Sequence, residues 1–423
     1  MRFITLLVLI FSLSFLSAQD TLRVMQYNLL YYGENTGFCN FTNNSPDQKD
    51  AWLRTIIEYA KPDIFTVNEI SRQSTYQTRV LQQVMNQTGY ALFKMAASPN
   101  IAESNIVNQL FYNSEKLALQ SQEVAQSEVR DIDVYRLYCL NEGLLTGDTI
   151  FIHCIVGHLK AGSSSSDKID RKEMTQNTLT YLGNYGRPGN YLFMGDFNLY
   201  DSDEPAFQLM ITNNDPVFRF YDPVDQIGDW HENAAYRQVH TQSTHIDSDG
   251  CHSSGGMDDR FDFILMNEVL QNKGDKVYYA ENSYHAMGQD GIRLNHSLLD
   301  PPNASLPAYV IDALYNMSDH LPVVMGLVVN ESLGLAEDHQ APGLKAFFRN
   351  PADDMLTMYV QSEKETRAII SLVSLSGSRV YLGNTRIHQS DIINIPLNGL
   401  APGMYFVHIQ TASGNLTRKV IKR

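Results

Sequence analysis

Eight polar side chains lie at the ends of apolar segments, where together they could do chemistry. Asp196 and Asn198 follow the apolar run 191–194, and the single residue between them puts both on one face of an extended chain. Asp196 offers a carboxylate that can act as a base, and Asn198 an amide that can hold an oxygen atom. Taken alone, the pair also fits an ordinary strand-to-loop turn. Similar groups end other apolar runs: Asn28, Glu69, His158, Asp262, Asp319 and His320.

Several of these positions have more than one interpretation. Glu69 lies between apolar residues, where a carboxylate needs either an Arg or Lys partner or a metal ion. Asp262 alternates with core residues, so it lies on an exposed strand face or is buried and held by a His. His153 is five residues before His158 and therefore points to the opposite face of the strand, which favours a packed structural role.

The set as a whole favours hydrolysis assisted by a metal ion. The sequence has no His/Cys spacing typical of zinc sites and no G-x-S-x-G nucleophile turn. Carboxylate and amide oxygens suit Mg²⁺, with Mn²⁺ or Ca²⁺ as alternatives. His158 and His320 suit proton transfer near neutral pH. A hard cation with acid and base groups, and no protein nucleophile, predicts attack of water on a phosphate ester.

The segments that position these residues alternate between strands and helices. Ser45, as a cap, and Pro46 predict the start of a helix that ends near Tyr59. Further elements are expected as helices at 72–89, 167–182 and 204–211, strands at 21–30, 64–67 and 191–194, and a hairpin formed by 131–141 and 149–160. This alternation predicts a two-sheet sandwich flanked by helices, with the functional groups at one end of the sheets.

Composition limits the class of protein. The chain has 423 residues, of which 43% are hydrophobic and 19% charged, as in an ordinary globular protein. Its 32 basic and 47 acidic residues give a net charge of −15, which provides no long-range attraction to nucleic acid or anionic lipid. Tight non-specific DNA binding is therefore not expected. An enzyme that holds phosphate through a divalent cation remains compatible with this charge.

The N-terminus predicts export. Met1-Arg2, the apolar run 3–16 and the small residues that follow predict a signal peptide over residues 1–18. A membrane anchor would need about 20 apolar residues, and the run 3–16 is shorter than that. In an oxidising compartment Cys139 could pair with Cys154 across the hairpin, and Cys39 with Cys251 through loops, while free thiols are an equal alternative.

The motifs around these residues resemble the endonuclease/exonuclease/phosphatase superfamily. They occur in its order over residues 20–329: YNLL at Asn28, NEI at Glu69, GHLK at His158, GDFN at Asp196 and Asn198, RFDFIL at Asp262, and SDHLP at Asp319 and His320. The family includes deoxyribonuclease I, AP endonucleases, neutral sphingomyelinases and inositol-polyphosphate phosphatases. The resemblance implies a four-layer α/β sandwich.

The resemblance also implies a role for each residue. Glu69 would bind the metal ion, assisted by Asn28 and Asp319. Asp196 would orient or deprotonate the attacking water, and Asn198 would hold a phosphate oxygen. Asp262 would orient His320, which would bind or protonate the phosphoryl group, with His158 as a second acid or phosphate contact. The family's usual Gln before the metal-binding Glu is Asn68 here, a departure beside the site.

The composition changes after Val329. Residues 330–343 are expected to be a linker, and residues 344–423 a small all-β domain. SLSGSRV at 374–380, LNGLAPGMYFVHI at 397–409 and the basic end TRKVIKR resemble the C-terminal sorting domain of the type IX secretion system. The resemblance implies passage through the periplasm, contact with the type IX secretion machinery and removal of the domain. The alternative is a small β-sandwich binding module.

Three functions fit these observations. The first is a secreted Mg²⁺-dependent phosphodiesterase, a nuclease that hydrolyses extracellular DNA or RNA. The second keeps the site and changes the substrate to a phospholipid head group or a phosphomonoester, which the acidic charge slightly favours. The third is a surface-displayed binding protein with an inactive site, which the presence of all eight polar residues argues against. We expect a monomer without a transmembrane anchor.

Overall fold

The computed structural model describes residues 20–141, 149–330 and 344–423, apart from 349–350, 363, 376, 389 and 413. The predicted signal peptide, and the predicted linker except Asn330, lie outside the described residues. Among the described residues, no helix is both long enough and apolar enough to cross a membrane.

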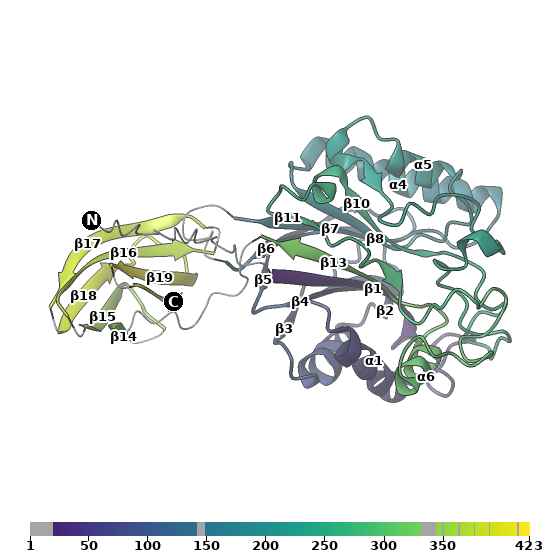
Figure 1. Ribbon diagram of the computed structural model, residues 1–423, viewed down its shortest axis with the longest axis horizontal. Coiled ribbons are helices and arrows are strands. Elements are labelled where there is room, and N and C mark those ends of the chain that lie inside the picture. Colours follow the sequence, from purple (N-terminus) through teal and green to yellow (C-terminus); the bar gives the residue numbers. More distant parts are fainter. Residues whose placement is uncertain are drawn as a thin grey trace, which may run out of the picture.

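Two β-sheets pack face to face in the N-terminal domain (Figure 1). The first has the order β11-β13-β1-β2-β4-β3, with β12 beside β13. Its strands are β1 (Asp20–Tyr32), β2 (Ile64–Ser71), β3 (Phe93–Met95), β4 (Ile106–Asn113), β11 (Val277–Tyr279), β12 (His285–Ala286) and β13 (Val323–Val329). The second has the order β5-β6-β7-β8-β10-β9. Its strands are β5 (Leu117–Gln126), β6 (Ile132–Cys139), β7 (Phe151–His158), β8 (Asn190–Asp196), β9 (Phe220–Tyr221) and β10 (Asp262–Asn267).

Helices cover the outer face of each sheet. The first sheet packs against α1 (Pro46–Ala60) and α6 (Ala308–Met317), with α2 (Ser74–Arg79) nearby, and the second packs against α4 (Ser165–Tyr185) and α5 (Pro205–Ile211). Buried side chains from both sheets, such as Val24 and Leu192, form the central core. This arrangement confirms the predicted four-layer α/β sandwich.

Helix starts depend on capping details that the sequence marks only partly. Ser45 precedes α1 as predicted, but its side chain makes no capping hydrogen bond. Helix α4 begins at Ser165, before the predicted Asp167, because Ser164 and Asp167 form a reciprocal capping box. The predicted helix 72–89 is divided into α2, the π-helical turn Val80–Val84 and the 3-10 turn Met85–Gln87.

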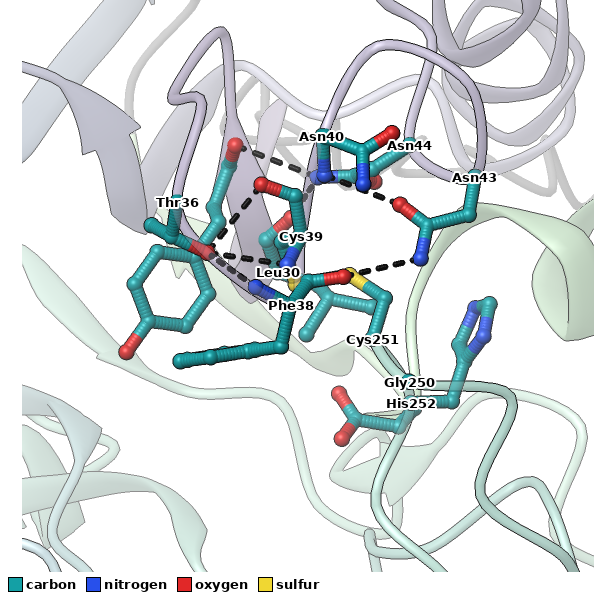
Figure 2. Close-up of a disulfide and its surroundings, with 12 residues drawn as sticks. Leu30, Thr36, Phe38, Cys39, Asn40, Asn43, Asn44, Gly250, Cys251 and His252 are labelled. Atoms are coloured by element: carbon teal, nitrogen blue, oxygen red, sulfur yellow. Dashed lines mark hydrogen bonds between the residues drawn. A yellow bond between two sulfur atoms is a disulfide. The ribbon is translucent and has the colours of Figure 1, made fainter.

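Of the alternatives that the sequence leaves open for the four cysteines, the structure has one bridge and two free thiols. Cys39 and Cys251 form a disulfide that ties the loop after β1 to the loop before β10 (Figure 2). Cys139 and Cys154 are not joined: both are buried, but Cys154 lies opposite Tyr135 in the β6–β7 register. The hairpin therefore does not place the two thiols face to face.

The C-terminal domain is all-β, as predicted. Its sheets have the orders β14-β15-β18 and β17-β16-β19-β20. The strands are β14 (Leu344–Phe348), β15 (Met355–Ser362), β16 (Thr366–Ser374), β17 (Arg379–Ile387), β18 (Ser390–Pro396), β19 (Gly403–Thr411) and β20 (Gly414–Lys422). Leu356, Ile370 and Val407 belong to a core of its own.

Candidate active site

Strand register brings three of the predicted residues into one row. In the parallel pair β7–β8, His158 lies opposite Asp196. In the antiparallel pair β8–β10, Asp196 lies opposite Asp262. All three side chains are buried at the same end of the second sheet. Polar groups that end three separate apolar runs therefore meet, because neighbouring strands end together.

The first sheet supplies Asn28 and Glu69 from its adjacent strands β1 and β2. The amide nitrogen of Asn28 donates to Glu69 Oε1 at 3.1 Å and to Asp196 Oδ2 at 2.9 Å. Its oxygen accepts the Leu30 N–H at 2.9 Å. In this arrangement Asn28 joins carboxylates from the two sheets, and its oxygen accepts one backbone hydrogen bond and keeps a second lone pair.

The backbone bends sharply around Glu69. Leu30, Tyr31 and Glu69 have φ angles of 44°, 48° and 58°, a region that non-glycine residues seldom adopt. The bend lets the Tyr31 N–H donate to Glu69 Oε2 at 3.0 Å. Buried Lys49 holds the bend, since its ammonium donates to the carbonyls of Leu29 and Leu30 at 2.7 and 2.8 Å. Backbone strain of this kind is typical of functional sites.

Glu69, His158 and Asp196 together have the geometry of a cation site. Their ligand atoms lie within 4.8 Å of one another. His158 Nε2 is 3.8 Å from Glu69 Oε1 and 3.6 Å from Asp196 Oδ2. Burial, with the charges of Arg130 and His320, lowers the pKa of His158 well below its usual value, so the ring is neutral and able to bind a cation. Two buried carboxylates so close together need compensating positive charge, and a divalent cation fits this donor set.

His320 and Asp262 form a buried pair beside the carboxylates. His320 Nδ1 is 2.7 Å from Asp262 Oδ2, and His320 Nε2 faces Asp196 Oδ2 at 3.8 Å. Burial alone would lower the pKa of His320, but the carboxylates of Asp262 and Asp196 outweigh it and raise that pKa well above its usual value. The ring is therefore protonated at neutral pH and can donate from Nε2.

Asp319 and Asn198 complete the predicted set. Asp319 Oδ2 accepts the Ser253 N–H at 2.8 Å, while its Oδ1 is buried without a hydrogen-bond partner among the described residues. Asn198 has a φ of 50°, and its amide donates to the Leu159 carbonyl at 3.3 Å. An orphaned carboxylate oxygen in a buried site is an available cation ligand.

The carboxylates hold their protons more tightly than usual. Burial raises the pKa of Glu69, and the charge of Asp319 adds to this rise against the opposing effects of His320 and Asn28. Burial, opposed by His320, raises the pKa of Asp196 to about 7. A carboxylate with a pKa near neutrality is suited to accept a proton from water.

Asn68 occupies the position where the resemblance expects Gln. Its oxygen accepts the Asp196 N–H at 2.8 Å and the Gln26 amide at 2.6 Å. Its nitrogen donates to Asn108 Oδ1 at 2.7 Å. The shorter side chain therefore still connects the two sheets and supports the backbone of Asp196.

Three residues at the site have no motif that marks them in the sequence. The Gln242 side-chain nitrogen lies 2.7 Å from His320 Nε2. Because a protonated imidazole can only donate, the amide would turn its oxygen toward His320 when the ring carries its proton. Arg130 donates to the Leu159 carbonyl at 3.1 Å, and its charge acts on Glu69 and His158. Lys49 supports the bend after β1. Each reaches the site from a loop or helix whose place depends on tertiary packing, so local patterns do not indicate it.

Comparison with known proteins shows a sequence match for the C-terminal domain and structural similarity to solved proteins. Residues 346–423 match the family model for the secretion system C-terminal sorting domain, which confirms the predicted sorting domain. No curated protein matches the chain.

Solved structures resemble the N-terminal domain at low identity. An endonuclease/exonuclease/phosphatase from Bacteroides vulgatus has 14% identity and a TM-score of 0.44, covering 73% of this chain and 98% of its own. D. rerio TDP2 complexed with single-strand DNA product has 11% identity and a TM-score of 0.43, covering 73% and 99%. The human Nocturnin catalytic domain with bound sulfate has 14% identity and a TM-score of 0.42, covering 74% and 97%.

Proposed function

We propose that the chain is an exported phosphoric ester hydrolase that requires a divalent cation, Mg²⁺ in the first instance, and that it cleaves phosphodiester bonds in DNA or RNA. One observation carries the proposal. Glu69, His158, Asp196 and His320 come from four separate segments and meet at one end of the sandwich. Hydrolysis of a phosphate ester needs a base, an acid and a cation-binding carboxylate together, and this set supplies all three.

Glu69 is the proposed principal cation ligand, and the buried Oδ1 of Asp319, which has no hydrogen-bond partner among the described residues, is a second proposed ligand. A bound divalent cation would neutralise charge on the phosphoryl oxygens. Asn28 keeps Glu69 and Asp196 at a fixed separation through its two hydrogen bonds. The chain thus holds its negative groups in place at a site shaped for a cation.

The reacting protons are assigned to two other groups. Asp196 accepts the proton of the attacking water, because its raised pKa makes it a base matched to neutral pH. His320, held by Asp262, donates from Nε2 to a phosphoryl or leaving-group oxygen. Asn198 and His158 are the proposed contacts for the remaining phosphate oxygens. Arg130 adds positive charge where the substrate's negative charge would lie.

Exposed aromatic rings beside the site support a nucleic acid substrate. Phe38 is 53% exposed and Phe41 45% exposed on the loop after β1, so both rings are available for contact. The Phe38 ring centroid is 5.6 Å from that of Tyr31, whose backbone contacts Glu69. The disulfide fixes this loop (Figure 2). Bases stack on exposed aromatic rings without sequence preference, which compensates for the absence of long-range electrostatic attraction.

The sorting domain gives the setting of this activity. Residues 346–423 match a secretion sorting domain, so the chain is exported. We further propose that it passes through the periplasm and that the domain is removed when the enzyme reaches the outside of the cell. An exported nuclease would meet nucleic acid released by other cells.

A substrate screen tests the proposal. The purified exported protein is assayed with single-stranded DNA, plasmid DNA and RNA, and with sphingomyelin and sugar phosphates, each in Mg²⁺, Mn²⁺ or Ca²⁺. Cleavage of a nucleic acid that His320→Ala abolishes is the expected result. Release of a lipid head group or of free phosphate without nucleic acid cleavage would reassign the substrate. Equal activity in the wild type and His320→Ala would show that another site is used.

A further inference from the structure

A second pocket lies on the outer face of the second sheet, away from the candidate active site. It has a volume of about 370 Å³ between the start of β7 and β8 and the end of α4. Its lining includes Arg136, His153, Tyr181, Tyr185, Arg187 and Tyr191. His153 precedes His158 by five residues on β7, which separates them by about 16 Å along the strand and turns them to opposite faces.

The two arginines in this pocket have no anionic partner. Among the described residues, neither guanidinium forms an ion pair or a side-chain hydrogen bond, although Arg136 lies over the Phe151 ring at 3.8 Å. Both arginines line the same pocket. Burial and the nearby charge of Arg187 lower the pKa of Arg136, and the charges of Tyr191 and Glu123 partly oppose this fall. Glu123 also lines the pocket, and its carboxylate accepts the Tyr181 hydroxyl.

Two polar atoms of the lining residues, both almost inaccessible to solvent, also lack partners. His153 is 4% exposed, and its Nε2 makes no hydrogen bond among the described residues. Arg136 Nε is likewise buried and unpartnered. Burial, followed by the charges of Arg136 and Arg187, lowers the pKa of His153 to about 4, so the ring is neutral and can donate or accept one hydrogen bond. Unpaired buried polar groups are uncommon in folded proteins and call for a partner.

The pocket wall is held in place before any ligand arrives. The His153 ring stacks on Tyr191 with centroids 4.2 Å apart. The Tyr191 hydroxyl donates to the Arg187 carbonyl at 2.7 Å and accepts the Arg187 N–H at 3.1 Å. The Tyr191 hydroxyl therefore fixes the backbone of Arg187 at the edge of the pocket. A preformed site binds its ligand at a lower entropic cost.

We infer that this pocket binds a small phosphorylated anion, whose phosphate lies between Arg136 and Arg187. Two guanidinium groups suit a tetrahedral oxyanion, which accepts several hydrogen bonds at once. The volume exceeds what a phosphate alone needs and falls in the range of small-molecule sites. Tyr185, 69% exposed at the rim, provides a flat surface for a nucleoside attached to the phosphate.

The test measures binding to the purified exported protein in EDTA, so that a metal-dependent site does not contribute. The probes are inorganic phosphate and adenosine 5′-monophosphate. Isothermal titration calorimetry measures the binding of each. Arg136→Gln and Arg187→Gln should each weaken binding of both probes roughly tenfold or more, as expected for a lost charge-assisted hydrogen bond. Arg237→Gln, at an exposed arginine outside the pocket lining, is the matched control and should bind as the wild type does.

Tyr185→Ala identifies the source of the phosphate. If a nucleotide is the ligand, this variant binds the mononucleotide more weakly and phosphate equally well; if the ligand is free phosphate, both are unchanged and the two probes bind alike. Unaltered binding in both arginine variants, or no binding of either probe by the wild type, would overturn the inference. Thermal melts check that Arg187→Gln, a change at an exposed residue, folds normally. Nuclease activity is not measured, so the result is independent of the proposed function.

Discussion

Asp262 Oδ2 lies 2.7 Å from His320 Nδ1, and both side chains are buried at the end of the sandwich where β8 and β10 run side by side. Asp262 Oδ1 makes no hydrogen bond among the described residues, so the His320 contact is its main interaction there. The carboxylate thus fixes both the orientation of the ring and the nitrogen that faces Asp196.

Asp262→Asn should lower kcat by about 10²–10⁴-fold, because a neutral amide stabilises protonated His320 far less than a carboxylate does. Asp262 is a principal cause of the raised pKa of His320, so that pKa should fall. Activity that needs the protonated ring is lost as pH rises through this pKa, and the loss should therefore begin at a lower pH in the variant. The pH profile of kcat measures this.

Asp312→Asn is the matched control for this variant, since Asp312 is an exposed carboxylate on α6. Its pH profile should coincide with that of the wild type. A profile of Asp262→Asn that is reduced in height but unshifted in pH would contradict the assigned role of the pair.

Glu69→Gln should abolish most of the cation affinity and the activity together. Tyr31 and Asn28 donate to the two oxygens of this carboxylate. A neutral amide of the same shape keeps only one of these acceptors, and it loses the charge that a hard cation requires. In the wild type, Mg²⁺ at 100 times its Kd should stabilise the fold by about 2.7 kcal/mol, and EDTA should reverse this. Thermal melts with and without Mg²⁺ measure the effect.

The exposed Glu58→Gln change on α1 serves as the control for Glu69→Gln. It should keep the full Mg²⁺-dependent rise in Tm. If Glu69→Gln shows the same rise as the wild type, the cation binds elsewhere.

The sequence predicts the site residues that lie at strand ends, but it does not predict those that reach the site from loops or from a helix. His158, Asp196 and Asp262 each end or begin an apolar run, and neighbouring strands bring such positions together without further information. Gln242 and Lys49 come from a loop and a helix, and only the packed fold places them. The hydrogen bonds of Asn28 could not be predicted either, because the spacing of residues does not indicate that its oxygen accepts the Leu30 N–H.

Loss of the Cys39–Cys251 disulfide should destabilise the N-terminal domain. The bridge joins residues 212 positions apart. Without it the unfolded chain gains conformational entropy, which the loop-closure relation puts at about 5 kcal/mol. Measured losses of stability on removing a native disulfide are typically about 2–5 kcal/mol. Denaturant unfolding of the Cys39→Ser, Cys251→Ser double variant measures the change. Activity should fall as well, because Ser253, two residues after Cys251, orients Asp319.

Reductant provides the internal control for the disulfide. The wild type in dithiothreitol should unfold at the same denaturant concentration as the double variant, whose own midpoint should not change with reductant. A double variant as stable as the oxidised wild type would show that the bridge does not constrain the unfolded chain.

Asp133 should make the fold less stable as pH rises. It is 2% exposed, and burial raises its pKa to about 7, although hydrogen bonds from Asn108 and Gln122 partly oppose the rise. Below pH about 4 the folded and unfolded states both hold the proton, so Asp133 contributes no pH dependence. Between about 4 and about 7 the unfolded state releases it and the folded state does not, which favours unfolding. Above about 7 both are ionised, and the cost stays constant.

Asp133→Asn imitates the protonated side chain and removes this titration. The variant should therefore be more stable than the wild type at pH 8, by about 4 kcal/mol, and should differ little from it at pH 4. Denaturant unfolding at pH 4, 6 and 8 measures the difference, with Asp312→Asn as the exposed control whose stability should follow the wild type at every pH. Equal stabilities of Asp133→Asn and the wild type at pH 8 would mean that Asp133 ionises in the folded protein at its ordinary pKa, with the Asn108 and Gln122 amides sufficient to solvate its charge.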